Sequence, residues 1–210
     1  MKVLTTAEAL AEAARLAAGP ARRILGITGA PGAGKSTLAH AVATAVGPEA
    51  VLVPMDGFHL AQAELVRLGR ADRKGAPDTF DAAGFVTLLE RLRAQDGGPG
   101  AETVYAPTFD RALEEPVAGA IPVGAQRLVV VEGNYLLHSD GAWARVAPLL
   151  DECWYVEVDD EVRLDRLTAR HTAFGKAPAA AHAWARGPDE RNAVLVAGTR
   201  ERATAVVRLG

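Results

Sequence analysis

The chain has 210 residues, of which 49% are hydrophobic and 23% are charged, and its formal net charge is −3. This length and hydrophobic content exclude extensive disorder, and residues 1–210 are expected to form a single domain around one sizeable core. A slightly acidic chain lacks the dense basic face that a general nucleic-acid-binding protein needs, so nucleic acid is not an expected partner.

An amphipathic surface helix is predicted near the N-terminus. Thr5 and Glu8 have the spacing of a capping box, and Gly19 followed by Pro20 is a stop signal. The charges within this segment argue against a signal peptide, and no apolar run is long enough to span a bilayer. Because the single Cys153 cannot form an internal disulfide, a cytoplasmic protein without a membrane partner is expected.

Short apolar runs alternate with helical patterns along the rest of the chain, which is typical of an α/β fold with a mostly parallel sheet and helices on both faces. The predicted strands are residues 24–28, 50–55, 102–107, 127–132, 153–158 and 203–209. The predicted helices are residues 36–46 and, capped by Asp81, residues 82–95, followed by a break at residues 97–100.

Three of the predicted strands end on residues that do not belong in an apolar core. Gly29, Asp56 and Glu132 each follow the last apolar residue of their strand. In an open parallel sheet, ligands bind in the crevice at the carboxyl ends of the strands. If these three strands run parallel, the three residues lie at one edge of one sheet.

The segment GAPGAGKS matches the pattern G-x-x-x-x-G-K-[ST] between a predicted strand and a predicted helix. Its glycines allow successive backbone N–H groups to point into one concavity, and the helix start adds further unpaired N–H groups. The loop therefore predicts binding of a nucleoside triphosphate, with Lys35 at the β- and γ-phosphates and Ser36 at Mg²⁺. The predicted nucleotide-binding residues here are Gly29, Ala30, Pro31, Gly32, Ala33, Gly34, Lys35, Ser36 and Thr37.

Other motifs distinguish among the classes of P-loop protein. None of the four lysines is followed by Asp two positions later, so the guanine-reading motif of a GTPase is absent from the sequence. An LSGGQ-like signature of transport ATPases is absent as well. A small-molecule kinase would need a base on the acceptor side, a metal ligand, and mobile cations for the transferred group.

Asp56 and Glu132 suit the first two of these roles. A carboxylate at residue 56, facing the P-loop, could orient an acceptor hydroxyl, and positioning matters more than basicity in a loose transition state. Glu132 and Ser36 would give Mg²⁺ two protein oxygens, which is enough for an ion that keeps several waters. The competing interpretations are an Asp-Gly turn at residue 56 and an exposed acid at residue 132.

Residues 161–176 suit the third role. Arg163, Arg166 and Arg170 are spaced to share one face of a helix, with the leucines facing elsewhere, and the helix leads to Gly175. The pattern predicts a lid over ATP at about residues 163–186, with a solvated basic surface as the alternative. Lys74 is either a cation of a substrate loop or an ordinary surface residue.

Together these motifs resemble the phosphoribulokinase/uridine kinase family, and most of all its bacterial pantothenate kinase type. The resemblance spans nearly the whole chain and rests on GAPGAGKST, MDGFHL, KGAPDTFD, YAPTFDR, VVVEGNYLL, RLDRLTARH and GTRERA. It implies a P-loop NTPase-type three-layer sandwich with a small helical lid. It also implies a kinase that uses ATP and Mg²⁺, and it suggests a homodimer.

The resemblance also implies roles for individual residues. Asp56 corresponds to the base, Glu132 to the metal ligand, and Lys35 with Ser36 to the phosphate and metal contacts of the P-loop. The implied lid cations are Arg170 and Arg166. The implied acceptor-pocket residues are His59, Asp110, Arg111 and Tyr135, and the TRERA stretch that contains Arg202 would lie near the adenine.

The sequence departs from the family at points that bear on the acceptor. Uridine kinases carry arginines on both sides of the lid glycine, whereas Phe174 and Lys176 flank Gly175 here. Pantothenate, a nucleoside and a sugar or polyol therefore all remain open as acceptors. The predicted function is ATP-dependent phosphorylation of an alcohol on a small metabolite, and the rival is a nucleotide-binding regulatory module with only slow ATP hydrolysis.

Overall fold

The computed structural model describes residues 1–95, 100 and 102–209, and its centre is a six-stranded sheet in the order β1-β8-β7-β2-β6-β3. Every strand pair in this sheet is parallel, which confirms the predicted sheet type. The strands are β1 (Lys2–Thr5), β2 (Arg23–Thr28), β3 (Ala50–Pro54), β6 (Leu128–Glu132), β7 (Glu152–Glu157) and β8 (Ala205–Arg208).

The strand register brings the predicted site residues to one edge. Glu132, the last residue of β6, pairs with Ile27 of β2 on one side and with Pro54 of β3 on the other. Gly29 and Asp56 each come two residues after these partners. The carboxyl ends of the three strands therefore meet, as the sequence predicted.

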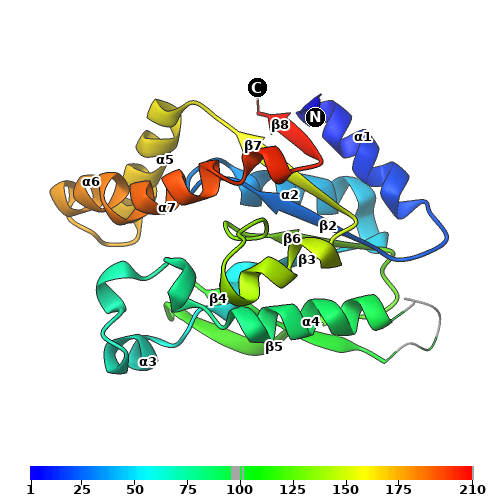
Figure 1. Ribbon diagram of the computed structural model, residues 1–210, viewed down its shortest axis with the longest axis horizontal. Helices are drawn as coiled ribbons and strands as arrows, with labels where there is room; N and C mark the ends of the chain where they lie inside the picture. The colour runs from blue at the N-terminus through cyan, green and yellow to red at the C-terminus, as the bar shows by residue number, and fades with distance from the viewer. Residues whose placement is uncertain (96–99, 101, 210) are drawn as a thin grey trace.

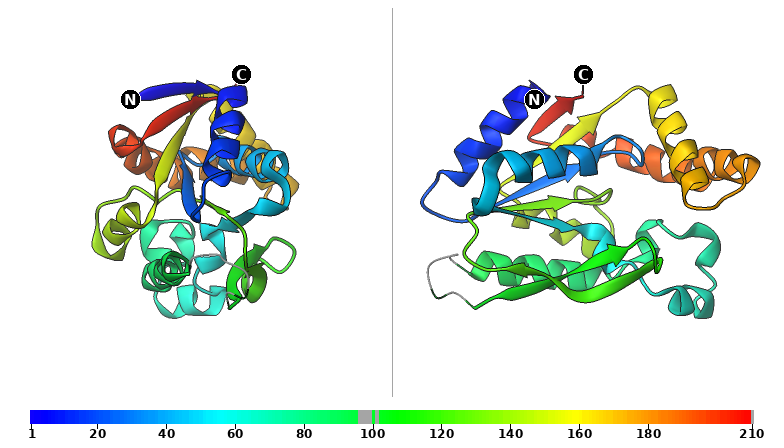
Figure 2. Two further views of the ribbon diagram at one scale, coloured as in Figure 1. Left: turned by 90° about the vertical axis from the view of Figure 1, so that its right-hand side faces the viewer. Right: turned by 180° about the vertical axis from the view of Figure 1, so that it is seen from behind.

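Helices cover both faces of the sheet, which confirms the layered architecture (Figures 1 and 2). Helices α1 (Thr6–Ala17) and α2 (Lys35–Val46) pack on one face, and α4 (Ala82–Ala94) packs on the other. The continuous apolar run of β6 follows from this arrangement, because its alternate residues enter two different cores. Leu128 and Val130 join the α1–α2 core, while Val129 and Val131 join the α4 core.

The capping signals of the sequence are present in the structure. The Thr5 hydroxyl accepts a hydrogen bond from the Glu8 N–H, and the Glu8 carboxylate accepts one from the Thr5 N–H. Asp81 caps α4 in the same way, through the N–H of Gly84. The predicted break at residues 97–100 lies mostly outside the described residues.

Among the described residues, two strands and two α-helices have no counterpart among the predicted elements, and one of these helices is α7 (Pro188–Ala197). Edge strand β1 ends at Thr5, the predicted cap of the N-terminal helix, and so precedes that helix. The strand β4 (Val104–Asp110) pairs antiparallel with the unpredicted β5 (Glu115–Val123), and this hairpin lies beside α4. The short helix α3 (Gln62–Arg67) begins the excursion between β3 and α4. The two strands and α3 contain neither a continuous apolar run nor a long stretch of apolar residues at helical spacing. The sequence pattern therefore does not predict them.

The predicted lid region folds into helices α5 (Asp160–Ala173) and α6 (Pro178–Arg186), and α7 (Pro188–Ala197) follows. Figures 1 and 2 show these helices and the α3 segment at the same end of the sheet. The described residues include no helix long and apolar enough to cross a membrane.

The expectation that Arg163 is a lid cation is wrong. Arg163 is 1% exposed, and its guanidinium donates to the carboxylates of Asp160 and Glu190. It shares the buried face of α5 with Leu167, and both side chains lie against Gly32 of the P-loop. The helix therefore turns Arg163 toward the protein, and Arg163 ties α5 to α7.

Replacing Gly57 with Ala should destabilise the protein, because a Cβ there would lie 2.5 Å from the backbone carbonyl oxygen of Pro107. Overpacking of this kind costs roughly 1–3 kcal/mol, and urea unfolding should show the loss. Gly124→Ala is the matched control, because the nearest atom to a Cβ at Gly124 is 3.9 Å away. Equal stability of the two variants would contradict the close approach of the hairpin to the Asp56 turn.

Candidate active site

The loop between β2 and α2 has the geometry of a phosphate cradle. Gly32 and Gly34 have φ values of +81° and +95°, in the left-handed region that favours glycine. A Cβ at Gly32 would also lie 2.7 Å from the carbonyl oxygen of Arg163. Gly34 caps α2 without any side-chain hydrogen bond, so the first N–H groups of the helix are available to an anion.

Lys35 begins α2 and is buried at the centre of the site. Its ammonium group donates a hydrogen bond of 3.0 Å to the carbonyl oxygen of Ala30, across the loop. Burial lowers the pKa of Lys35, while the nearby carboxylates of Glu132 and Asp56 act in the opposite sense. A buried ammonium group surrounded by carboxylates is held ready for an anionic ligand.

Glu132 is buried beside Ser36 at the end of β6. Burial raises the pKa of Glu132, and the Lys35 charge and a hydrogen bond with Ser36 oppose that rise. A carboxylate and a hydroxyl are hard oxygen donors, and the described residues hold no cluster of three or more acidic, histidine or cysteine side chains that could enclose a metal. This donor set fits Mg²⁺, which takes few protein ligands and keeps its waters.

Asp56 lies in the turn that follows β3 and faces a cation. Its carboxylate accepts a hydrogen bond of 2.9 Å from the Arg111 guanidinium group, which comes from the hairpin. Nδ1 of His59 lies 4.0 Å from the same carboxylate, and the His59 ring packs on Phe80 with ring centroids 4.0 Å apart. The structure thus brings together three of the residues named as site candidates from the sequence, Asp56, His59 and Arg111.

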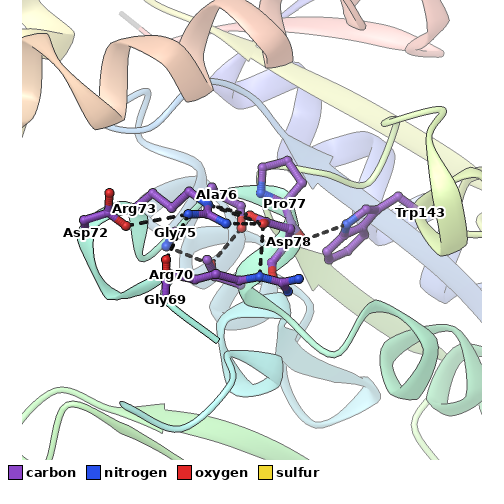
Figure 3. Close-up of polar contacts among 10 residues, drawn as sticks. Gly69, Arg70, Asp72, Arg73, Gly75, Ala76, Pro77, Asp78 and Trp143 are labelled. Atoms are coloured by element: carbon purple, nitrogen blue, oxygen red, sulfur yellow. Dashed lines mark hydrogen bonds and ion pairs between the residues drawn. The ribbon is translucent and has the colours of Figure 1, made fainter. Parts of the chain in front are cut away.

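The loop of residues 69–79 contributes Lys74 and Gly75 to the wall of the cavity that Asp56 also lines. Internal ion pairs hold this loop in shape (Figure 3). The carboxylate of Asp78 pairs with Arg73 at 2.9 Å and with Arg70 at 3.4 Å. The indole N–H of Trp143 donates to the Pro77 carbonyl oxygen at 3.1 Å, which fastens the loop to the core. Lys74 therefore projects from a fixed loop, and its ammonium group donates to the Glu114 carbonyl oxygen at 2.9 Å.

The reactive side chains of these segments line one cavity of about 350 Å³. Lys35, Asp56 and Glu132 reach it from the sheet edge, Lys74 and Arg111 from the loop and the hairpin, and Arg170 from the lid. Arg166 lies outside this cavity but beside the P-loop, 3.5 Å from the position of a Cβ on Gly34. The site thus combines a phosphate cradle, several carboxylates and several cations around one small space.

Helices α5 and α7 contribute polar residues that the sequence reasoning missed. The His171 ring lies 2.6 Å from the Asp189 carboxylate, and the Asn192 amide donates to the Gly75 carbonyl oxygen at 3.2 Å. Asp189 and Asn192 are both buried and lie one turn apart on α7, so α7 contacts the lid helix α5 and the loop that carries Lys74. The only local sequence signal for Asp189 and Asn192 is their spacing within PDERN, and this spacing is equally typical of the exposed start of a helix.

Three predicted site residues lie elsewhere. Tyr135 is fully buried behind the cavity, where its hydroxyl donates to the Gly75 carbonyl oxygen, so it supports the wall rather than lining it. The Asp110 carboxylate accepts from the N–H groups of Ala112 and Leu113, which makes it a turn residue of the hairpin.

The third is Arg202. It precedes β8 and donates to the Leu137 carbonyl oxygen, whereas the P-loop lies at the carboxyl ends of the strands. Leu209, which follows β8, takes the place beside the P-loop: its side chain is 2.6 Å from the position of a Cβ on Gly34. Arg202 itself thus points away from the P-loop, whereas Arg200 of the same TRERA stretch pairs with Glu157 at the end of β7 and lines a pocket with Ala30 and Ala33 of the P-loop.

Comparison with known proteins agrees with this geometry. The family model described as "Phosphoribulokinase / Uridine kinase family" matches residues 24–174, from β2 to the end of α5. The chain belongs to this family. It is therefore a member of a family of ATP-dependent P-loop kinases that act on small molecules.

Individual members of the family are similar over much of the chain. A solved structure from Silicibacter sp. TM1040, described as a "putative fructose transport system kinase", is 36% identical and superposes with a TM-score of 0.80, covering 94% of this chain and 98% of that one. The ATP-dependent kinase-like protein notR' of Aspergillus versicolor is 38% identical over 129 residues, which are 59% of this chain and 74% of that protein.

The structure of YFH7 from Saccharomyces cerevisiae has a TM-score of 0.83 at 17% identity and covers 99% of both chains. At that identity the likeness concerns the fold alone, and it supports the P-loop kinase architecture.

The pH dependence of stability should reveal the buried His59. Burial lowers the pKa of His59, and the Asp56 carboxylate only partly opposes this. The unfolded chain therefore takes up a proton near pH about 6.5 while the folded protein resists it, so the free energy of unfolding should fall as the pH drops below that value. His59→Gln should make this fall shallower, by at most about 1.4 kcal/mol per pH unit.

Urea unfolding between pH 7.5 and 5.5 measures the effect. His182→Gln is the control, since His182 is exposed on α6. An undiminished slope in the His59 variant would show that its imidazole is not held neutral by the fold.

Proposed function

We propose that the protein transfers the γ-phosphoryl group of ATP to an alcohol hydroxyl of a small metabolite. The observation that carries this proposal is the meeting of Lys35, Asp56 and Glu132, from three adjacent strand ends, at one cavity of about 350 Å³. Such a cavity can hold the terminal phosphate and a small acceptor between a phosphate cradle and a carboxylate.

Asp56 is the proposed base. Its carboxylate would accept a hydrogen bond from the acceptor hydroxyl and aim that oxygen at the γ-phosphorus. The oxygen forms a bond to phosphorus as the bond to the β–γ bridging oxygen breaks, ADP leaves, and the hydroxyl proton passes to Asp56 and then to solvent. To do this, Asp56 must give up at least part of its contact with Arg111.

Ser36 and Glu132 are the proposed protein ligands of Mg²⁺. When bound, the ion supplies positive charge that neutralises the phosphate oxygens. Glu132 must be ionised to bind it, and the adjacent Lys35 charge favours the ionised form against the effect of burial.

Lys35 and Arg170 are the proposed cations for the transferred phosphoryl group. Lys35 is fixed within the P-loop, whereas Arg170 lies on the exposed side of the lid helix and also lines the cavity. Lid closure would bring Arg170 to the phosphate and exclude water from the reaction. Arg166, beside Gly34, is the proposed lid contact on the nucleotide.

Replacing Asp56 with Asn should lower turnover by about 10²–10⁴, the usual contribution of a positioned proton acceptor, and should change ATP affinity far less. The measurements are kcat with an acceptor found by screening pantothenate, nucleosides, sugars and polyols, and Kd for ATP by calorimetry. Asp140→Asn is the control, because the Asp140 side chain is 84% exposed. Equal losses of turnover and affinity would remove Asp56 from the role of base, and acceptor-independent slow hydrolysis across the panel would favour a regulatory module.

A further inference from the structure

The carboxylate of the proposed base, Asp56, is paired in the structure with a cation of the hairpin, Arg111. The Arg111 guanidinium group lies 2.9 Å from the Asp56 carboxylate, and it also lies over the Phe109 ring at 5.0 Å from the centroid. Lys74 lies over the same ring at 5.1 Å. Two cations from separate segments, the hairpin and the loop of residues 69–79, thus gather around one ring beside the base.

Most N–H groups of these two cations remain available to a ligand. A guanidinium group has five N–H donors, and the Arg111 side chain is 47% exposed with one hydrogen bond, to Asp56. The Lys74 ammonium group has three donors; it bonds the Glu114 carbonyl oxygen and lies 3.8 Å from the Glu114 carboxylate. Arg111 is therefore the freer of the two and the better suited to bind an oxyanion in two-point fashion.

The aromatic rings near Arg111, and Trp184 on α6, already have ring or cation contacts and are poorly placed to stack on an uncharged acceptor, whereas Phe174 at the end of α5 is exposed. His59 packs on Phe80 and lies 5.0 Å from Phe109, whose surroundings also include both cations. The Lys176 ammonium group covers Trp184 at 4.5 Å from its centroid. A nucleoside base or a sugar face would have to displace these groups, so the rings serve the cations rather than a flat ligand.

The charges of the cavity leave Arg111 without an anionic partner when the reacting groups are in place, in addition to Lys176, which lies over Trp184. In the proposed reaction, Lys35 and Arg170 pair with the transferred phosphate, and Glu132 binds the metal. Asp189 is paired with His171, and Glu114 lies next to Lys74. Once Asp56 turns to the acceptor hydroxyl, Arg111 loses its partner, and a second anion next to that hydroxyl would replace it.

We propose that the acceptor carries an oxyanion, a carboxylate or a phosphate, close to the hydroxyl that is phosphorylated, and that Arg111, assisted by Lys74, binds it. This inference rests on the proposed kinase function and narrows its acceptor to small hydroxy acids or phosphorylated polyols and sugars. Acceptor binding would then exchange ion pairs. Arg111 would leave Asp56 and pair with the oxyanion of the acceptor, and the Asp56 carboxylate would accept a hydrogen bond from the acceptor hydroxyl. An uncharged alcohol would leave Arg111 attached to the base.

Matched pairs of acceptors test the inference. The pairs are glycerate and glycerol, pantothenate and panthenol, and ribose 5-phosphate and ribose, each with ATP and Mg²⁺, and the readout is kcat/KM for ADP release together with detection of the phosphorylated product. In the pair with the highest activity, the anionic member should exceed the neutral one at least tenfold. Arg111→Gln should reduce that ratio to near one, and Lys74→Gln should reduce it in part.

Arg145→Gln is the matched control, because Arg145 pairs with Glu90 away from the cavity and should leave the ratio unchanged. Calorimetry supplies a readout that does not depend on turnover: the anionic member should bind the wild type more tightly than Arg111→Gln, while the Kd for a non-hydrolysable ATP analogue stays within about twofold. Thermal unfolding of each variant establishes that it is folded.

The outcomes distinguish a failure of the oxyanion inference from a failure of the proposed kinase function. Phosphorylation of a neutral member as fast as its anionic counterpart would overturn the oxyanion while leaving the kinase intact. An anion preference that survives Arg111→Gln would overturn the assignment to Arg111. Absence of transfer to every member, charged or neutral, would count against the kinase proposal itself and would remove the inference with it.

Discussion

The backbone hydrogen-bond register between β2, β6 and β3 is the constraint on which the site depends. Because Glu132 pairs with both Ile27 and Pro54, the loops that follow these strands begin at one level of the sheet. A shift of one residue in either pair would turn the side chains that follow to the opposite face. The apolar residues of β6 enter a core on each face, and this burial fixes the register.

The second feature of the site is that its charges compensate one another before any ligand binds. Lys35 and Glu132 are both buried, and each moves the pKa of the other back toward the charged form. Asp56 is paired with Arg111, and Asp189 with His171. In the proposed reaction, ligand binding would exchange partners within a charged site, which avoids the cost of leaving a charge buried and alone.

The sequence was sufficient for the parts of the site that depend on local pattern. The P-loop carries its own glycine spacing, and Asp56 and Glu132 interrupt apolar runs, so their placement follows from strands that must be parallel. The orientation of Arg163 could not be foreseen, because helical spacing gives a shared face without saying which face is buried. The contact of Arg202 with the Leu137 carbonyl oxygen could not be foreseen either, because it joins segments 65 residues apart and the motif does not encode it.

The contacts of His171 with Asp189 and of Asn192 with Gly75 come from the packing of α7 against α5 and against a loop 117 residues away in sequence, for which the sequence has no periodic signal. These contacts join the lid to the acceptor wall, and the cavity exists only because both sides are held. A crystal structure of the protein with Mg²⁺ and a non-hydrolysable ATP analogue tests the account most directly. The γ-phosphate should lie between Lys35 and Asp56, with the metal on Ser36 and Glu132; a γ-phosphate directed away from Asp56 would contradict the account.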